Sequence, residues 1–312
     1  MEERKLAVII PFYKINFFSE TLESLANQSN KNFAVYIGND ASPDDPLETI
    51  HKYSSKIRIK YFPFNNNLGS ISLSKQWHRC INETKLEEWM MILGDDDVLD
   101  PNCVSEFYSN LKAINENKIK IIRFARRVID GLNRPVSKVQ KHPVLENSVH
   151  FLFRKLKGDA SSSLSEYIFK TAAVKEVKFR NFPLAWHADD CALLEFSHFG
   201  NIYSINSAVA SIRISNVNIS GRKDLDRLKN KSSFYFYHYL LRNYHQKFSE
   251  KEKEILYERY EKRVLNDKKD ISLLLKLSSI YLRNVRLYSY FRFVKKLSIS
   301  IQNASRSKSR KI

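Results

Sequence analysis

The alternation of short apolar runs with amphipathic segments over the first 130 residues constrains the fold more than any other feature of the sequence. Runs rich in valine, isoleucine and aromatic residues predict strands at residues 6–10, 33–37, 57–62, 89–93 and 120–124. Apolar residues at helical spacing predict helices between them, at 19–28, 46–53, 71–83 and from 101 onward. Strands and helices that alternate in this way form a mostly parallel sheet covered by helices on both faces. The sequence therefore predicts an α/β protein.

The second half of the chain gives a weaker pattern. It predicts two strands and an intervening helix, at residues 166–169, 209–214 and 188–198. From residue 224 onward it predicts helices, which are separated near 248–249 and 267–270. We therefore expect an α/β domain over residues 1–222 and a helical C-terminal region over residues 223–312.

Positive charge is concentrated in the C-terminal region. The chain has a formal net charge of +18, and residues 221–312 hold 24 lysines and arginines against 9 acidic residues. Residues 271–312 hold ten lysines and arginines and no acidic residue. Such a block favours an anionic partner, either nucleic acid or a membrane surface.

Residues 287–301 predict a basic amphipathic helix. On a helical wheel one broad face holds Leu287, Tyr290, Phe291, Phe293, Val294, Leu297 and Ile301. Arg292, Lys295 and Lys296 lie on the other side. A helix of this kind can lie in the interface of an anionic membrane. Its apolar face can also pack against the rest of the chain or against another subunit of a homo-oligomer, and the sequence leaves these alternatives open.

The sequence lacks the usual signals for secretion or for crossing a membrane. Two acids stand early in "MEERKLAVIIPFY", and Pro11 ends its apolar run, which is not the pattern of a signal peptide. No segment approaches the ~18–20 apolar residues of a membrane span. Three widely spaced cysteines predict neither a disulfide framework nor a zinc site. We expect a cytoplasmic protein, with peripheral contact to the inner face of the cell membrane as the variant that the basic helix suggests.

Three adjacent carboxylates follow one of the predicted strands, at the edge where α/β sheets bind their ligands. Asp95, Asp96 and Asp97 come directly after the apolar run at 89–93. Neighbouring carboxylates repel one another, and a divalent cation shared with a substrate diphosphate would offset the repulsion. Mg²⁺ or Mn²⁺ suits such oxygen ligands. A solvated acidic turn explains these three residues equally well when they are taken alone.

Two further carboxylate positions have a weaker signal. Asp40 follows the strand at 33–37 and could accept a hydrogen bond from a base imide or a ribose hydroxyl, although a turn that only bends the chain is favoured for this residue by itself. Asp189 and Asp190 open a predicted helix. They could supply a general base, but pairing with the helix dipole is the simpler interpretation of these residues alone.

Taken in order along the chain, these sites resemble the family 2 glycosyltransferases. That family has the GT-A fold, a Rossmann-like mixed sheet that has helices on both faces and binds nucleotide sugars. The matching segments are "LAVIIPFYK", "FAVYIGNDASPDD", "NNNLGS", "MMILGDDDVLDPNCV", "HADDCALLEFSHFGNIYSI" and "SIRISNVNISG". They cover residues 5–220, and their common order carries more weight than any single segment.

The resemblance implies a donor site and a metal site. The residues that it assigns to the donor nucleotide are Pro11, Tyr13, Asp40, Lys75, Asp95 and Asp96. A divalent cation, Mn²⁺ or Mg²⁺, would be held among Asp95, Asp96 and Asp97. The first acid of the family's DxD segment falls on Gly94, so the resemblance leaves open which two carboxylates bind the cation.

The resemblance also implies a general base and a closing segment. Asp190 matches the family's base, with Asp189 beside it. In the closing segment, Asn216 and Asn218 stand where some relatives place a metal-binding histidine.

The implied reaction is the inverting transfer of a sugar from a nucleoside-diphosphate sugar, most simply a UDP-sugar. The acceptor would be a hydroxyl of a saccharide or a polyprenyl-linked saccharide, as in surface polysaccharide biosynthesis. One alternative is a nucleotidyltransferase, but "PFYKIN" is not the glycine-rich phosphate loop that such an enzyme needs. Another is a nucleic-acid-binding protein that uses the basic C-terminal region, which leaves Asp95–Asp97 without a role. A catalytically silent saccharide-binding relative is a third.

Overall fold

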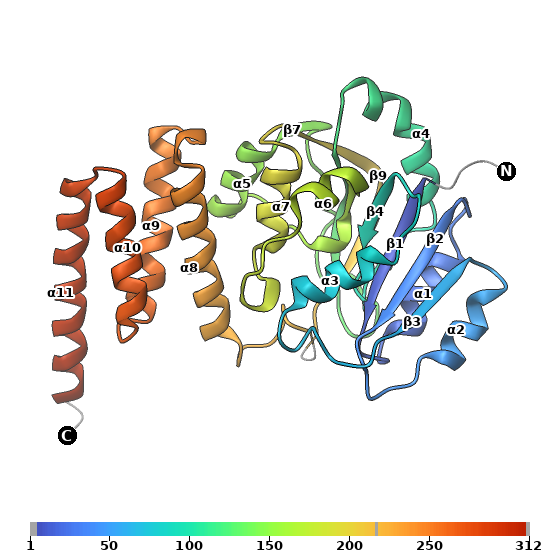
Figure 1. The fold of residues 1–312 in the computed structure, drawn as a ribbon, viewed down its shortest axis with the longest axis horizontal. Helices are drawn as coiled ribbons and strands as arrows, with labels where there is room; N and C mark the ends of the chain where they lie inside the picture. Colours follow the sequence, from blue (N-terminus) through green and yellow to red (C-terminus); the bar gives the residue numbers. More distant parts are fainter. Residues whose placement is uncertain (1–4, 216–217, 310–312) are drawn as a thin grey trace. The chain divides into compact units, whose positions relative to one another are not determined.

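The computed structural model describes residues 5–215 and 218–309, and its contacts divide the chain into two units (Figure 1). The first unit comprises Met1–Asn181 and Ala188–Lys223. The second comprises Phe182–His187 and Asp224–Ile312. A short segment just before the helix of Asp189 and Asp190 therefore belongs to the C-terminal unit, which the sequence did not predict.

The described part of the first unit contains nine strands, which form one sheet. They are β1 (Leu6–Phe12), β2 (Phe33–Asn39), β3 (Ile59–Pro63), β4 (Trp89–Ile92), β5 (Val98–Leu99), β6 (Ile121–Ile129), β7 (Leu145–Asn147), β8 (Tyr167–Lys170) and β9 (Asn201–Arg213). The helices are α1 (Phe18–Ala26), α2 (Leu47–Ser54), α3 (Leu73–Asn82), α4 (Cys103–Glu116), α5 (Ser148–Lys157), the 3₁₀ helix η1 (Leu164–Glu166), α6 (Thr171–Val177) and α7 (Ala188–Phe196).

The sheet has a parallel half and a mixed half. Its order is β3-β2-β1-β4-β8-β6-β9-β5, with β7 paired to β9. The strands β3, β2, β1 and β4 are parallel to one another, as the alternating pattern predicts. Beyond β4 the antiparallel strand β8 separates β4 from β6, and β5 and β7 pair antiparallel with β9. The mixed sheet implied by the resemblance is thus confirmed, and the mostly parallel sheet holds only for the first four strands.

Alternation along the strands explains why helices cover both faces. The core cluster on one face combines side chains of β1, β2, α1 and α4: Leu6, Val8, Ile10, Phe12, Val35, Ile37, Phe18, Leu22, Leu25, Val104 and Phe107. Gly38 of β2 points to the other face, where α3 packs closely. A Cβ on Gly38 would lie 2.3 Å from the Sγ of Cys80, so only glycine lets α3 approach the sheet here.

Two predicted boundaries of the second half were wrong. The strand predicted at 209–214 is the end of the much longer β9, which begins at Asn201 and shifts register opposite Phe124 and Ala125. The strand predicted from residue 166 begins one residue later in the structure, at Tyr167, because Glu166 is the last residue of the 3₁₀ helix η1.

The second unit is helical, as predicted. Its described elements are η2 (Pro183–Ala185), α8 (Asp226–Asn243), η3 (His245–Lys247), α9 (Glu250–Asn266), α10 (Ile271–Arg283) and α11 (Leu287–Ser309) (Figure 1). The predicted breaks near 248–249 and 267–270 are confirmed, and a third break at 284–286 was not predicted. None of the described helices has the length and apolarity needed to cross a membrane.

The apolar face predicted for helix α11 is only partly buried. Phe293 and Leu297 are buried in the helical unit. The exposed members are Leu287, Phe291, Val294 and Ile301. One side of the face therefore packs within the chain, and the other side is left uncovered.

Candidate active site

The three adjacent carboxylates lie in the loop between β4 and β5, at the carboxyl end of the parallel half of the sheet. Gly94 provides the space in which two of them converge. A Cβ on Gly94 would lie 2.9 Å from both the Oδ1 of Asp96 and the Oδ2 of Asp97. A side chain at position 94 would therefore displace both carboxylates, which gives a physical reason for glycine at this position.

Asp95 joins the loop after β1 to the loop after β4. Its Oδ2 accepts hydrogen bonds from the backbone amides of Tyr13 and Lys14, each at 2.9 Å. Because β1 and β4 are parallel neighbours, their carboxyl ends meet at this edge of the sheet. Burial, with the charge of Asp96 next, raises the pKa of Asp95 to about 6.

Asp97 is anchored to the end of β9. The backbone amide of Arg213 donates to its Oδ1 at 2.8 Å, and the Ser165 hydroxyl also bonds its side chain. The Arg213 guanidinium is buried and donates to the backbone oxygen of Asp96. Burial, with the charge of Asp96 next, raises the pKa of Asp97 to about 8.

Asp96 is oriented by the closing segment. The amide nitrogen of Asn218 donates to its Oδ2 at 3.2 Å. The amide oxygen of Asn218 already accepts from the backbone of Gly221 and Ser215. In this orientation Asn218 does not offer an oxygen to a cation, and Asn216 lies outside the described residues.

At the triplet Asp95–Asp97 the effect of burial outweighs that of the nearby positive charges. Burial, the largest cause, raises the pKa of Asp96 as well as those of its neighbours. The charges of Arg213 and Lys14 oppose the shift at Asp96, and Lys14 also opposes it at Asp95. Among the described residues no cluster of three potential metal ligands is present. Two carboxylates over Gly94 still suit a hard cation that takes its other ligands from phosphates and water.

Asp40 follows β2 and holds the loop between β3 and α3. Its carboxylate accepts from the backbone amides of Leu68 at 2.8 Å and Gly69 at 2.7 Å. Arg79 of α3 pairs with it at 2.5 Å. Burial raises the pKa of Asp40, although these three contacts oppose the shift. Asp40 is therefore a buried organiser of a loop, and a carboxylate with about four acceptor positions has room for one more donor.

The remaining donor-site candidates lie on β1, on the loop that follows it and on α3. Pro11 is half-buried in β1, and Tyr13 is 37% exposed beside Asp95. Lys75 is exposed on α3, and its backbone amide donates a hydrogen bond to the hydroxyl of the N-cap residue Ser72. Arg79, one turn later on the same face of α3, reaches Asp40, and the sequence interpretation missed it.

Asp190 lies on α7 and is 7% exposed. The ammonium group of Lys155, on α5, forms an ion pair with its Oδ1 and donates to the Ser162 hydroxyl at 2.5 Å. Burial by itself lowers the pKa of Lys155, but the carboxylates of Asp190 and Asp189 outweigh it and the net pKa is raised. The candidate base thus has a built-in counter-ion, which the sequence interpretation also missed.

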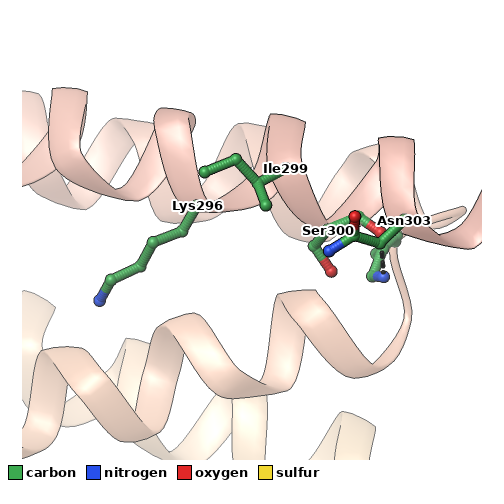
Figure 2. A pocket seen from close by; sticks show the side chains of 5 residues that line it. Lys296, Ile299, Ser300 and Asn303 are labelled. Atoms are coloured by element: carbon green, nitrogen blue, oxygen red, sulfur yellow. Dashed lines mark hydrogen bonds between the residues drawn. The ribbon is translucent and has the colours of Figure 1, made fainter.

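A separate hollow of about 530 Å³ lies within the C-terminal unit (Figure 2). Lys268, Lys296, Ile299, Ser300 and Asn303 line it. Lys268 donates to the backbone oxygen of Ser300, and Lys296 pairs with Glu261. Both lysines are therefore engaged within the helical unit, and nothing lining the hollow resembles the carboxylate sites.

The family is decided by a match to the sequence model described as glycosyl transferase family 2, which spans residues 7–174. The chain belongs to this family. The resemblance stated from the six segments is thus confirmed. The match contains β1, the triplet and Asp40, and it ends before Asp190.

Curated relatives and solved structures agree with this assignment. A protein named "Uncharacterized glycosyltransferase" from Rickettsia bellii is 39% identical over 67 residues, which are 21% of this chain and 10% of the relative. The same name and identity apply to a protein from Rickettsia felis, where the match covers 11% of the relative. The chain therefore spans about a tenth of the length of these relatives.

Structures of S. aureus TarS have a similar fold. TarS 1–349 matches with a TM-score of 0.58 and 18% identity, over 84% of this chain and 72% of that one. TarS 1–349 in complex with UDP-GlcNAc matches with a TM-score of 0.61, over 84% and 73% of the two chains. At this identity the likeness concerns the fold, and it confirms an α/β, GT-A-like architecture followed by helices.

Proposed function

We propose that the protein transfers a sugar from a nucleoside-diphosphate sugar to a hydroxyl group, with inversion at the anomeric carbon. The observation that carries the proposal is the buried triplet Asp95–Asp97, whose pKa values are raised, at the carboxyl end of a family 2 sheet. The donor we favour is a UDP-sugar, and the likeness to a TarS complex that contains UDP-GlcNAc supports this choice. The acceptor class is a saccharide or a polyprenyl-linked saccharide.

The donor nucleotide would lie along the loops after β1, β2 and β4. Tyr13 presents an exposed ring for a base, and Pro11 lies two residues earlier in β1. Asp40 has one acceptor position left for a base imide or a ribose hydroxyl. Lys75 stays a candidate for the phosphates from its exposed place on α3.

A divalent cation, Mn²⁺ or Mg²⁺, would be held by Asp96 with help from Asp95 or Asp97. The space over Gly94 and the raised pKa values of the three carboxyls support such an ion. Bound there with the donor, the ion would act as a Lewis acid toward the leaving diphosphate.

The residues of the chain would carry the rest of the reaction. The acceptor hydroxyl oxygen bonds to the anomeric carbon while the bond from that carbon to the phosphate oxygen breaks. The electron pair of the broken bond leaves with the nucleoside diphosphate, and the hydroxyl proton passes to the carboxylate of Asp190. Asp189, beside it on α7, adds negative charge that favours the proton's arrival. A single displacement of this kind inverts the sugar.

Calorimetric binding tests this proposal. We expect UDP to bind more tightly than GDP or dTDP, and only when Mn²⁺ is present. Asp96→Ala is expected to abolish the Mn²⁺-dependent binding, while Asp159→Ala, at an exposed carboxylate of the same unit, leaves it unchanged. Absence of nucleotide binding in the wild-type protein under every condition would overturn the proposal.

For the C-terminal unit we propose contact with an anionic membrane surface, on the cytoplasmic face of the cell membrane. Exposed apolar side chains recur at helical spacing on α11 at Leu287, Phe291 and Val294, and on α10 at Ile271 and Leu275. Residues 271–312 contain no acid. Apolar side chains beside cations suit an anionic bilayer, whereas two copies of so positive a surface would repel each other.

Vesicle binding by the full-length protein tests the membrane contact. We expect sedimentation with phosphatidylcholine–phosphatidylglycerol vesicles and not with phosphatidylcholine alone. Phe291→Glu should weaken binding more than Tyr288→Glu, which adds the same charge at an exposed position outside the predicted apolar face. A Phe291-dependent dimer, or nucleic-acid binding without vesicle binding, contradicts the proposal.

A further inference from the structure

One short segment of the first unit touches both groups of carboxylates. Ser165 Oγ accepts a hydrogen bond from the backbone amide of Gly94 at 3.0 Å and also bonds Asp97. Three residues earlier, Ser162 Oγ accepts from the ammonium group of Lys155 at 2.5 Å. Lys155 in turn pairs with Asp190. The segment 161–166, "SSSLSE", therefore connects the triplet with the candidate base.

The segment is held rigidly by buried polar contacts. The Glu166 side chain accepts from the backbone amide of Ser163 and closes a capping box over η1. Arg126 of β6 pairs with Glu166 at 3.4 Å and donates to the Ser161 hydroxyl. Glu166 is fully buried, and Arg126 is 6% exposed. Because one arginine holds both ends of the segment, the hydroxyls of Ser162 and Ser165 are fixed relative to each other.

Asp190 needs a counter-ion to act as a base. A carboxylate that is 7% exposed in a largely apolar helix is disfavoured in its charged form by burial. The acids that act on Lys155 within the first unit are Asp190 and Asp189 on α7 and Glu166 on η1. Asp189 and Glu166 add negative charge near the pair, whereas the ammonium group of Lys155 bonds Asp190 directly and favours its ionised form.

We propose that Lys155 is a positioning residue that keeps Asp190 ionised and oriented. The segment 161–166 would fix the position of Lys155 relative to the triplet. The proposal rests on the proposed function, since it gives Asp190 the role of the base. To that function it adds a role for Lys155 of α5 and a structural connection, the segment 161–166, between the triplet and Asp190.

A purely structural ion pair would have different consequences. Loss of such a pair would lower stability and leave the pH dependence of turnover unchanged. A positioning role predicts that the acidic limb of the profile of kcat against pH moves upward, because Asp190 without its cation becomes harder to ionise. It also predicts a loss in kcat with little change in KM for the donor, which binds at the triplet.

The kinetic experiment compares Lys155→Met, Lys155→Arg and the control Lys157→Met, which removes an exposed lysine from the same helix. For Lys155→Met we expect kcat to fall at least about tenfold and the acidic limb to move up by about 1–3 pH units. Lys155→Arg should restore the position of the limb, and Lys157→Met should match the wild type. Ser162→Ala, which removes only the link to the segment, should lower kcat less than Lys155→Met.

A folding measurement tests the pair independently of turnover. In a double-mutant cycle with Lys155→Met and Asp190→Asn, the loss of unfolding free energy in the double variant should be smaller than the sum of the single losses. Additive losses, or a folded Lys155→Met enzyme with the wild-type pH profile, overturn the inference alone. A wild-type protein that binds no nucleotide sugar overturns the proposed function, and the positioning role with it.

Discussion

The two carboxylate groups of the first unit differ in how their charge is compensated. Asp95–Asp97 are held by backbone amides and by the neutral side chains of Asn218 and Ser165. Asp190, in contrast, is paired with the ammonium group of Lys155. A lysine of the chain is thus paired directly with the candidate base. At the triplet, burial outweighs the charges of Lys14 and Arg213, and there we propose that a divalent cation binds.

This difference matches the two tasks that the proposed reaction sets. A leaving diphosphate brings its own negative charge, so a mobile divalent cation can neutralise donor and triplet together. A base must stay ionised before the acceptor arrives, and a permanent counter-ion provides for that. The predictions below test the contrast, from the largest expected effect on stability to the smallest.

Arg213 is expected to be the most sensitive residue around the triplet. Its buried guanidinium binds the backbone oxygens of Asp96 and Asp130 and pairs with Glu20. Arg213→Met leaves these partners unpaired and should lower the free energy of unfolding by about 3–5 kcal/mol. Chemical denaturation measures it, with Arg134→Met as the control, because the exposed Arg134–Asp130 pair should contribute about 0–1 kcal/mol. Equal losses for the two variants would show that Arg213 does not organise the triplet.

Added Mn²⁺ should act at the triplet and not at Asp190. At a concentration about 100-fold above its dissociation constant, a cation that binds only the folded state stabilises by about 2.7 kcal/mol. Thermal denaturation should show this gain in the wild type and in Asp190→Asn, but not in Asp96→Ala. The gain should be larger at pH 8 than at pH 6, because the pKa values of Asp95 and Asp97, about 6 and about 8, mean that protons compete with the ion. A gain that survives Asp96→Ala would contradict the contrast.

We expect the stability of the protein to depend on pH through Glu166, which lies on the segment between the triplet and Asp190. Burial raises its pKa from 4.5 to about 7, so the folded protein keeps a proton that the unfolded chain releases. The wild-type free energy of unfolding should therefore fall as pH rises from about 4.5 to 7. Glu166→Gln cannot ionise, so the difference between variant and wild type should grow by about 1–3 kcal/mol over this range. Denaturant titrations at each pH give both free energies of unfolding. A difference between variant and wild type that does not change with pH would contradict a buried Glu166 that keeps its proton.

The parallel half of the sheet could be predicted because each strand carries its own signal. Leu6–Phe12 and Phe33–Asn39 are apolar at nearly every position, as strands buried on both faces must be. The mixed half could not be predicted from composition, because the antiparallel place of β8 depends on pairing with strands more than 40 residues away in sequence. The wheel of 287–301 was too coarse to show which part of a broad apolar face packs within the chain.

The same distinction holds for the sites. The triplet was predictable, since three acids after an apolar strand are conspicuous. Arg79 could have been found, because it lies one turn after Lys75 on the same face of α3 and has the longer reach. Lys155 had no sequence signal that pointed to Asp190: the two residues are 35 positions apart, and only the contact between α5 and α7 brings them together.

The most direct test of the central claim is the release of UDP from a panel of UDP-sugars, with water as the acceptor so that the unidentified acceptor is not needed. The account predicts Mn²⁺-dependent release by the wild-type protein. It predicts that Asp190→Asn binds the same donor with unchanged affinity while kcat falls by about 10²–10⁴-fold. Release at the wild-type rate by Asp190→Asn, or at an equal rate without any divalent cation, would contradict the division of labour between the triplet and the base.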